Sequence, residues 1–122
     1  MAALINAWQL SPNEAGYINR QQGESCTNCG ANLRSIALAD ALCALLPTTF
    51  RLVDYGTSPE AALVKVLELN EAGSLHATLK KLPQHIFGAY PHVDMNDLPY
   101  EDQSSDPVIH SVTLEHVPNP IQ

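Results

Sequence analysis

The pattern of apolar and polar positions predicts an irregular beginning followed by a regular helix. Residues 1–25 show neither a helical nor a strand period, and we expect them to form an irregular arm anchored by Trp8. Residues 32–46 place leucine and isoleucine close to the 3.6-residue period, with alanines between them, which predicts a helix. Asn32 is the expected N-cap of this helix, and Ser35 is expected to face solvent.

Three apolar segments farther along the chain predict strands. Residues 64–69 (Val-Lys-Val-Leu-Glu-Leu) have the β-branched, apolar character of a central strand that is buried on both faces. Residues 85–90 and 108–111 predict two further strands. Short helices are expected to begin at Pro59, at Leu75 and at Thr113. This order of elements predicts an α/β fold.

Length and composition set limits on what this protein does. A chain of 122 residues with 45% apolar and 16% charged residues is expected to form one compact domain. Its net charge of −7 provides no electrostatic match for a phosphate backbone, so direct nucleic-acid binding is not expected. No apolar run approaches the roughly 20 residues of a membrane helix, so no membrane interaction is expected. The odd number of cysteines, 3, argues against a disulfide framework and favours a cytoplasmic location.

Two of the cysteines form a Cys-x-x-Cys-Gly turn, at Cys26 and Cys29. Such a turn directs two thiolates at one point and supplies half of a tetrahedral zinc site. The second pair of ligands is missing nearby, so a turn with two free thiols is the simpler interpretation. A zinc ion shared between chains, or completed by distant histidines, is the alternative.

The end of the central strand is a candidate ligand site. Glu68 is followed by a turn of small and polar residues, Asn70 to Gly73, and then by a predicted helix. In this geometry the backbone N–H groups at a helix start can meet a ligand, and a carboxylate can hold a hydroxyl or an ammonium group. A plain turn between strand and helix is the alternative.

Residues 94–104 (Asp-Met-Asn-Asp-Leu-Pro-Tyr-Glu-Asp-Gln-Ser), 108–111 (Val-Ile-His-Ser) and 114–118 (Leu-Glu-His-Val-Pro) form an ordered series of motifs. The series resembles class I S-adenosylmethionine-dependent methyltransferases of the type 11 group. These commonly carry an Asp-x-x-x-Leu-Pro-Phe/Tyr loop, a turn ending in Ser-Phe-Asp, a hydrophobic strand and Leu-Glu-His-Val. Residues 66–73 (Val-Leu-Glu-Leu-Asn-Glu-Ala-Gly) are similar to a variant of their first cofactor motif.

The resemblance implies a partial, Rossmann-like methyltransferase core over residues 59–122, with S-adenosylmethionine as its cofactor. Residues 1–58 would precede it with the arm, the Cys-x-x-Cys turn and the first helix. Asn70 stands where a glycine is usual, and asparagine tolerates the left-handed backbone conformation that a glycine adopts there. The cofactor-binding residues that the resemblance implies are Glu68, Asn70, Ala72, Gly73, Asp94, Met95, Leu98 and Ser111.

The resemblance also implies separate roles for the residues after the second predicted strand. Asp94 would accept hydrogen bonds from the cofactor, either from its ribose or from its adenine. Met95 or Leu98 would pack against adenine. His110 and Ser111 would border the methyl-transfer pocket, and His110 is the candidate general base for a hydroxyl acceptor.

The chain departs from the family pattern at several positions. Ser105 replaces an aromatic residue, Pro107 begins a strand, and Val112 stands where a polar residue is common. The family pattern continues beyond Gln122, so we expect a sheet that is incomplete, or truncated, on its C-terminal side. An unfinished sheet edge favours a homodimer. Two alternative functions follow: a degenerate, inactive interaction module, or a small zinc-binding module through the two cysteines.

Overall fold

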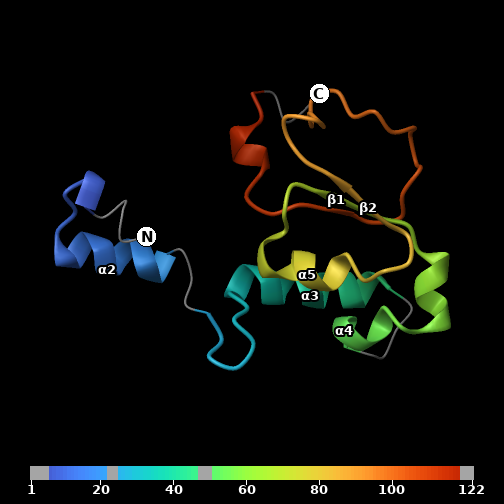
Figure 1. Ribbon diagram of the computed structural model, residues 1–122, viewed down its shortest axis with the longest axis horizontal. Coiled ribbons are helices and arrows are strands. Elements are labelled where there is room, and N and C mark those ends of the chain that lie inside the picture. Colours follow the sequence, from blue (N-terminus) through green and yellow to red (C-terminus); the bar gives the residue numbers. More distant parts are fainter. Residues whose placement is uncertain (1–5, 22–24, 47–50, 119–122) are drawn as a thin grey trace.

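A three-stranded parallel sheet lies at the centre of the fold (Figure 1). The computed structural model describes residues 6–21, 25–46 and 51–118. Strand β1 (Val66–Leu69) lies between β2 (His85–Gly88) and β3 (Val108–Ile109), and both pairings are parallel. In register, Val66 pairs with His85 and Glu68 with Ile109. The predicted α/β class is therefore confirmed.

The central position of β1 follows from its composition. All four of its residues are buried, and none exposes more than 3% of its surface. A strand of mainly apolar residues is favoured in the middle of a parallel sheet, where its side chains are buried. The prediction of a buried central strand is confirmed, although the strand is shorter than residues 64–69.

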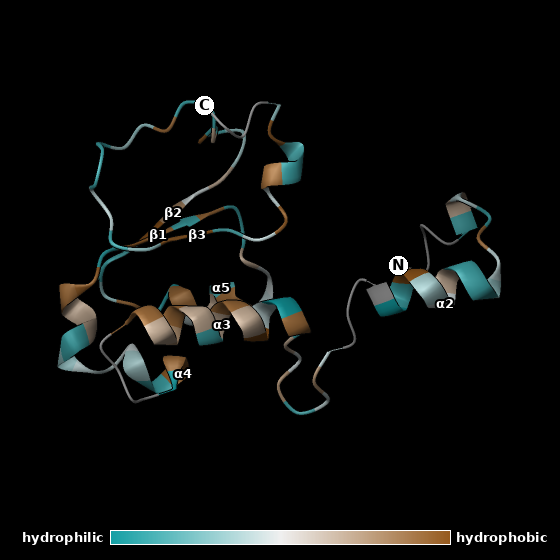
Figure 2. Cartoon of the chain, turned by 180° about the vertical axis from the view of Figure 1, so that it is seen from behind, coloured by the Kyte–Doolittle hydropathy of each residue, from teal (hydrophilic) through white to brown (hydrophobic). Residues whose placement is uncertain are grey.

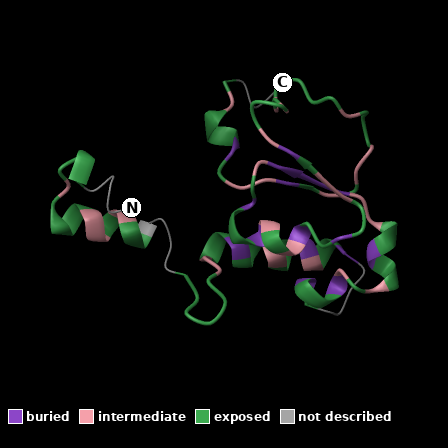
Figure 3. Cartoon of the chain, viewed as in Figure 1, coloured by how far each residue is buried: buried purple, intermediate pink, exposed green. Residues whose placement is uncertain are grey.

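Helices cover one face of this sheet (Figure 1). They are α3 (Leu33–Leu45) and α5 (His76–Leu79), and α4 (Leu52–Tyr55) packs against α3 on the side away from the sheet. Hydrophobic residues lie on α3 and along the strands (Figure 2), and buried residues gather where the helices face the sheet (Figure 3). The large apolar members of this core are Leu42, Leu46, Leu52, Tyr55, Leu75, Leu79, Leu82 and Ile109.

The N-cap of α3 forms as predicted. The side chain of Asn32 accepts a 2.9 Å hydrogen bond from the backbone N–H of Ser35. Ser35 itself is 4% exposed, so the prediction that it faces solvent is wrong. It lies against the turn after β1, because a Cβ atom placed on Gly73 would be 3.1 Å from Ser35 Oγ.

Short 3₁₀ helices replace some of the predicted helices. They are η1 (Pro59–Leu63), η2 (Gly73–Leu75) and η3 (Leu114–His116). The first begins at Pro59 as predicted. The helix predicted from Leu75 is divided between the end of η2 and the single turn of α5, and it ends at Leu79.

The arm predicted to be irregular contains a helix, α2 (Pro12–Gln21), so that prediction is wrong. Ser11 and Glu14 form a capping box: the backbone N–H and hydroxyl of Ser11 both donate to Glu14 Oε2, at 2.8 and 2.7 Å. Trp8 is 65% exposed and does not anchor the arm. Figure 1 shows α2 to one side of the sheet and its helices.

The segment between β2 and β3 folds back onto the end of β2. A Cβ atom on Gly88 would lie 2.8 Å from Tyr100 Oη and 3.0 Å from Val93 Cγ2. Gly88 is buried beneath these two side chains.

Within the described segments, no helix has both the length and the apolar character needed to cross a membrane.

Candidate functional site

The turn after β1 is fixed to the end of β2 by Asn70. The backbone N–H of Asn70 donates a 2.8 Å hydrogen bond to the carbonyl of Gly88. The side chain of Asn70 accepts a 3.0 Å hydrogen bond from the backbone N–H of Tyr90. The backbone of Asn70 is left-handed, with φ of 53°, as the resemblance implied. Asparagine therefore provides both the conformation and a link between strand ends.

A tight turn at residues 94–97 positions Asp94. Its Oδ1 atom accepts hydrogen bonds of 2.9 Å from both the backbone and the side-chain nitrogen of Asn96. The backbone N–H of Asp97 donates to the Asp94 carbonyl at 3.1 Å. The hydrogen bonds from Asn96, the backbone one first, hold the pKa of Asp94 below its usual value. Asp94 is exposed and carries its negative charge at neutral pH.

The chain after β3 turns sharply at Val112. Its backbone is left-handed, with φ of 54°. A β-branched residue rarely adopts this conformation, which costs about 1–3 kcal/mol, and such outliers gather at ligand sites. The hydroxyl of the buried Thr113 donates to the Ser111 carbonyl at 3.1 Å and supports this turn.

These three segments surround a cavity of about 600 Å³ at the carboxyl ends of the strands. Its volume lies within the range of small-molecule sites. The strand order β2-β1-β3 makes β1 the point at which the connections change direction, and open α/β sheets bind ligands beside such a point. The described lining residues are Asn70, Glu71, Tyr90, Val93, Asp94, Met95, Asn96, Ser111, Val112, Thr113, His116, Val117 and Pro118.

The cavity brings together four of the residues that the resemblance implied: Asn70, Asp94, Met95 and Ser111. They come from three segments separated by up to 41 positions (111 − 70). Asp94 follows β2, the second strand, and precedes β3. The predicted residues that do not line the cavity in the described structure are Glu68, Ala72, Gly73, Leu98 and His110.

The imidazole at this cavity is that of His116, which the sequence did not single out as a ligand-binding residue. His116 ends η3 and is exposed, whereas His110 is half-buried directly after β3. The Nδ1 atom of His110 is buried and has no hydrogen-bond partner among the described residues. Only the position of His116 within the Leu-Glu-His-Val-Pro motif could have pointed to it.

The charges around the cavity have one sign. Glu71 and Asp94 both line it, and the described lining contains no lysine or arginine. A cavity with carboxylates and without basic side chains favours a cationic ligand over one that carries phosphates.

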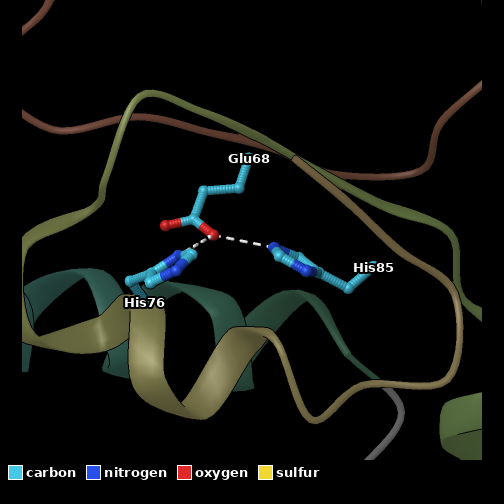
Figure 4. Close-up of side chains that lie close together, drawn as sticks. All are labelled: Glu68, His76 and His85. Carbon is cyan, nitrogen blue, oxygen red and sulfur yellow. Dashed lines mark hydrogen bonds and ion pairs between the residues drawn. The ribbon is translucent and has the colours of Figure 1, made fainter. Parts of the chain in front are cut away.

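Glu68 points to a different place, beneath the turn that follows β1 (Figure 4). Its carboxylate is fully buried. Oε1 accepts a 2.9 Å hydrogen bond from the backbone N–H of Ala72. Oε2 lies 2.8 Å from His76 Nδ1 and 2.7 Å from His85 Nε2. A second polar cluster, apart from the cavity lining, is thus formed by Glu68, His76 of α5 and His85 of β2.

Cys26 and Cys29 are both exposed on a turn closed by a 2.7 Å hydrogen bond from Gly30 N–H to the Cys26 carbonyl. Hydrogen bonds from the backbone of Cys29, then from that of Asn28, and then from the Cys29 side chain lower the pKa of the Cys26 thiol. In the described part of the chain, neither thiol belongs to a group of three or more potential metal ligands. Zinc binding by this pair stays a prediction.

Comparisons of the chain with protein-family models, with curated proteins and with solved structures found no match.

Proposed function

We propose that the chain binds S-adenosylmethionine in the cavity at the carboxyl ends of its strands and acts as a methyltransferase-like module. The observation that carries the proposal is the meeting of Asn70, Asp94, Met95 and Ser111 around one cavity. The resemblance implied these residues separately, from motifs in different parts of the sequence. A Rossmann-like methyltransferase core, with a smaller sheet than usual, accounts for the strand order.

The charge of the cavity supports this cofactor over other nucleotides. S-adenosylmethionine carries a sulfonium and an ammonium group, which Glu71 and Asp94 would attract. A dinucleotide would bring phosphates into a cavity without a basic side chain among its described residues. Among the described residues, both hydrogen bonds to the side chain of Asp94 are accepted by Oδ1, and Oδ2 would accept from the cofactor.

Methyl transfer requires that an acceptor be held in line with the sulfonium, and this positioning supplies much of the rate. His116 is our candidate to remove a proton from a hydroxyl acceptor, because it lines the cavity and His110 does not.

Calorimetric titration with S-adenosylmethionine tests the proposal. Wild-type protein is expected to bind one equivalent, and Asp94→Asn to bind about 10–100-fold more weakly, since a charge-assisted hydrogen bond contributes about 1.5–3 kcal/mol. Asp97→Asn is the matched control, because Asp97 is an exposed aspartate of the same turn that is absent from the cavity lining. No heat at millimolar ligand, or equal losses in the two variants, would contradict the proposal.

A further inference from the structure

Three potential metal ligands converge beneath the turn after β1, as Figure 4 shows. Glu68 comes from β1, His76 from the first position of α5, and His85 from the first position of β2. One ligand atom from each residue lies within 4.8 Å of the other two. From this arrangement we infer that Glu68, His76 and His85 bind one divalent transition-metal ion of the zinc class.

The ligand set fits such an ion. Two imidazoles and one carboxylate are ligands that zinc takes in sites with three protein ligands and a water molecule. His76 Nδ1 and His85 Nε2 both face Glu68 Oε2, so each ring already directs a nitrogen atom at the same point. The backbone N–H of Ala72 holds Oε1 and orients the carboxylate, as an outer hydrogen bond does in known metal sites.

Charge gives a second argument for a cation. Glu68 is 0% exposed, and the two histidines are its only ion-pair partners in the described part of the chain. A buried carboxylate is costly unless a positive charge lies beside it. A divalent ion held by the two imidazoles and this carboxylate would place positive charge beside it.

The geometry requires only a small adjustment. Ligand atoms about 2.0–2.1 Å from a tetrahedral ion lie about 3.3 Å from one another. The present N···O distances of 2.7 and 2.8 Å would therefore increase by about half an ångström when the ion binds. The side chain of His76 is 24% exposed and that of His85 8%, so an ion and its water ligand reach the site from the His76 side. The ring of Phe87, 4.9 Å from that of His76, flanks this side.

This site is independent of the cofactor cavity, whose described lining includes none of the three ligands. A bound ion would connect β1, α5 and β2 and would fix the turn from which Asn70 reaches the cavity.

Titration of the chelator-treated full chain with Zn²⁺ and with Co²⁺ tests the inference. The titration is carried out in a Cys26→Ser/Cys29→Ser background, which removes the competing thiols. We expect one equivalent of Zn²⁺ to bind and to raise the unfolding temperature, and Co²⁺ to give the visible absorption of a site of low coordination number.

His76→Gln and His85→Gln keep an amide that can donate to Glu68 but remove a ligand. Loss of an outer hydrogen bond costs about 10–100-fold in affinity, so loss of a ligand should cost at least about 100-fold.

His92→Gln is the matched control, because His92 is an exposed histidine outside the cluster, and its Zn²⁺ affinity should equal that of the parent. Circular dichroism verifies that each variant is folded. If His85→Gln does not fold, the more exposed His76 carries the test. Absence of Zn²⁺ binding in the Cys26→Ser/Cys29→Ser parent would overturn the inference, as would equal affinities of the His76→Gln and His92→Gln variants.

Discussion

The backbone N–H of Tyr90 donates a 3.0 Å hydrogen bond to the side chain of Asn70, and both residues line the cavity. This bond joins the chain beyond β2 to the turn beyond β1. It requires Asn70 to keep the left-handed backbone that directs its side chain across the two strand ends. One asparagine therefore determines both the local conformation and the spacing of two cavity walls.

Replacement of Asn70 separates these two contributions. Asn70→Ala should lower the free energy of unfolding more than Asn70→Gly, by about 1 kcal/mol, because only alanine is strained at φ of 53°. Both variants lose the hydrogen bond to Tyr90, so both should bind the cofactor more weakly. Urea denaturation measures the difference in stability. If the two variants are equally stable, backbone strain does not govern this position.

Gly88 should not tolerate a larger side chain. In Gly88→Ala the new Cβ would approach Tyr100 Oη to 2.8 Å and Val93 Cγ2 to 3.0 Å, which should destabilise the fold by about 1–3 kcal/mol. Tyr100→Phe removes the nearest atom and should recover part of the loss in a double-mutant cycle.

Gly16→Ala is the control for Gly88→Ala, because the nearest atom to its new Cβ is Arg20 Nη1 at 3.8 Å. It should leave stability unchanged or raise it, since alanine favours the helix α2. An equal effect of the two substitutions on thermal unfolding would argue against close packing at Gly88.

Cys26 should be the most reactive thiol of the chain. Its pKa is lowered by hydrogen bonds from the backbone of Cys29 and of Asn28 and from the Cys29 side chain, so more of its reactive thiolate is present near neutral pH. Alkylation with iodoacetamide, followed by peptide mass spectrometry, should modify Cys26 before Cys29 and before the half-buried Cys43. Cys29→Ala should slow the reaction only in part, because the backbone hydrogen bonds remain. Faster modification of Cys43 would contradict the prediction.

Tyr55 should make the fold sensitive to alkaline pH. Its side chain is 1% exposed, and its hydroxyl has no hydrogen-bond partner among the described residues. Burial, and then the charge of Glu60, raise the pKa of Tyr55 above 10.0. The unfolded chain therefore loses this proton first, and stability falls as the pH rises from about 10 toward the folded-state pKa.

Tyr55→Phe removes both the unpaired buried hydroxyl and its ionisation at alkaline pH. Loss of the unpaired hydroxyl should raise the free energy of unfolding by about 1 kcal/mol at neutral pH, and the advantage over wild type should grow above pH 10. Denaturant titration at several pH values measures the difference in free energy of unfolding between Tyr55→Phe and wild type. An advantage that stays constant as the pH rises would show that the pKa of Tyr55 is the same in the folded and unfolded chain, and would contradict the prediction.

The sequence predicts best those elements that local chemistry specifies. Strand β1 is apolar at nearly every position and can only be central, and Asn32 precedes an apolar helical period and caps it. The helix α2 was missed because its apolar residues are few, although Ser11 and Glu14 have the spacing of a capping box. Periodicity alone therefore underestimates a helix whose start is fixed by polar groups.

The polar clusters depend on contacts that no local pattern contains. The fully buried Glu68 was expected in the cofactor site, yet its carboxylate meets His76 and His85, which lie 8 and 17 positions later. The cavity was easier to predict, since its residues follow strand ends and parallel strands end at one edge of a sheet. His116 was missed because it lies in η3, whose orientation depends on the left-handed turn at Val112.

A nuclear magnetic resonance titration of the isotope-labelled chain with S-adenosylmethionine tests the proposed function most directly. Binding in the cavity should shift the backbone amide signals of Asn70, Met95 and Val112 the most, and should leave those of Leu42 and Cys29 unchanged. The shifts should saturate at one equivalent. An unchanged spectrum at millimolar ligand, or shifts that cluster at the Cys26–Cys29 turn, would contradict the proposed cofactor site.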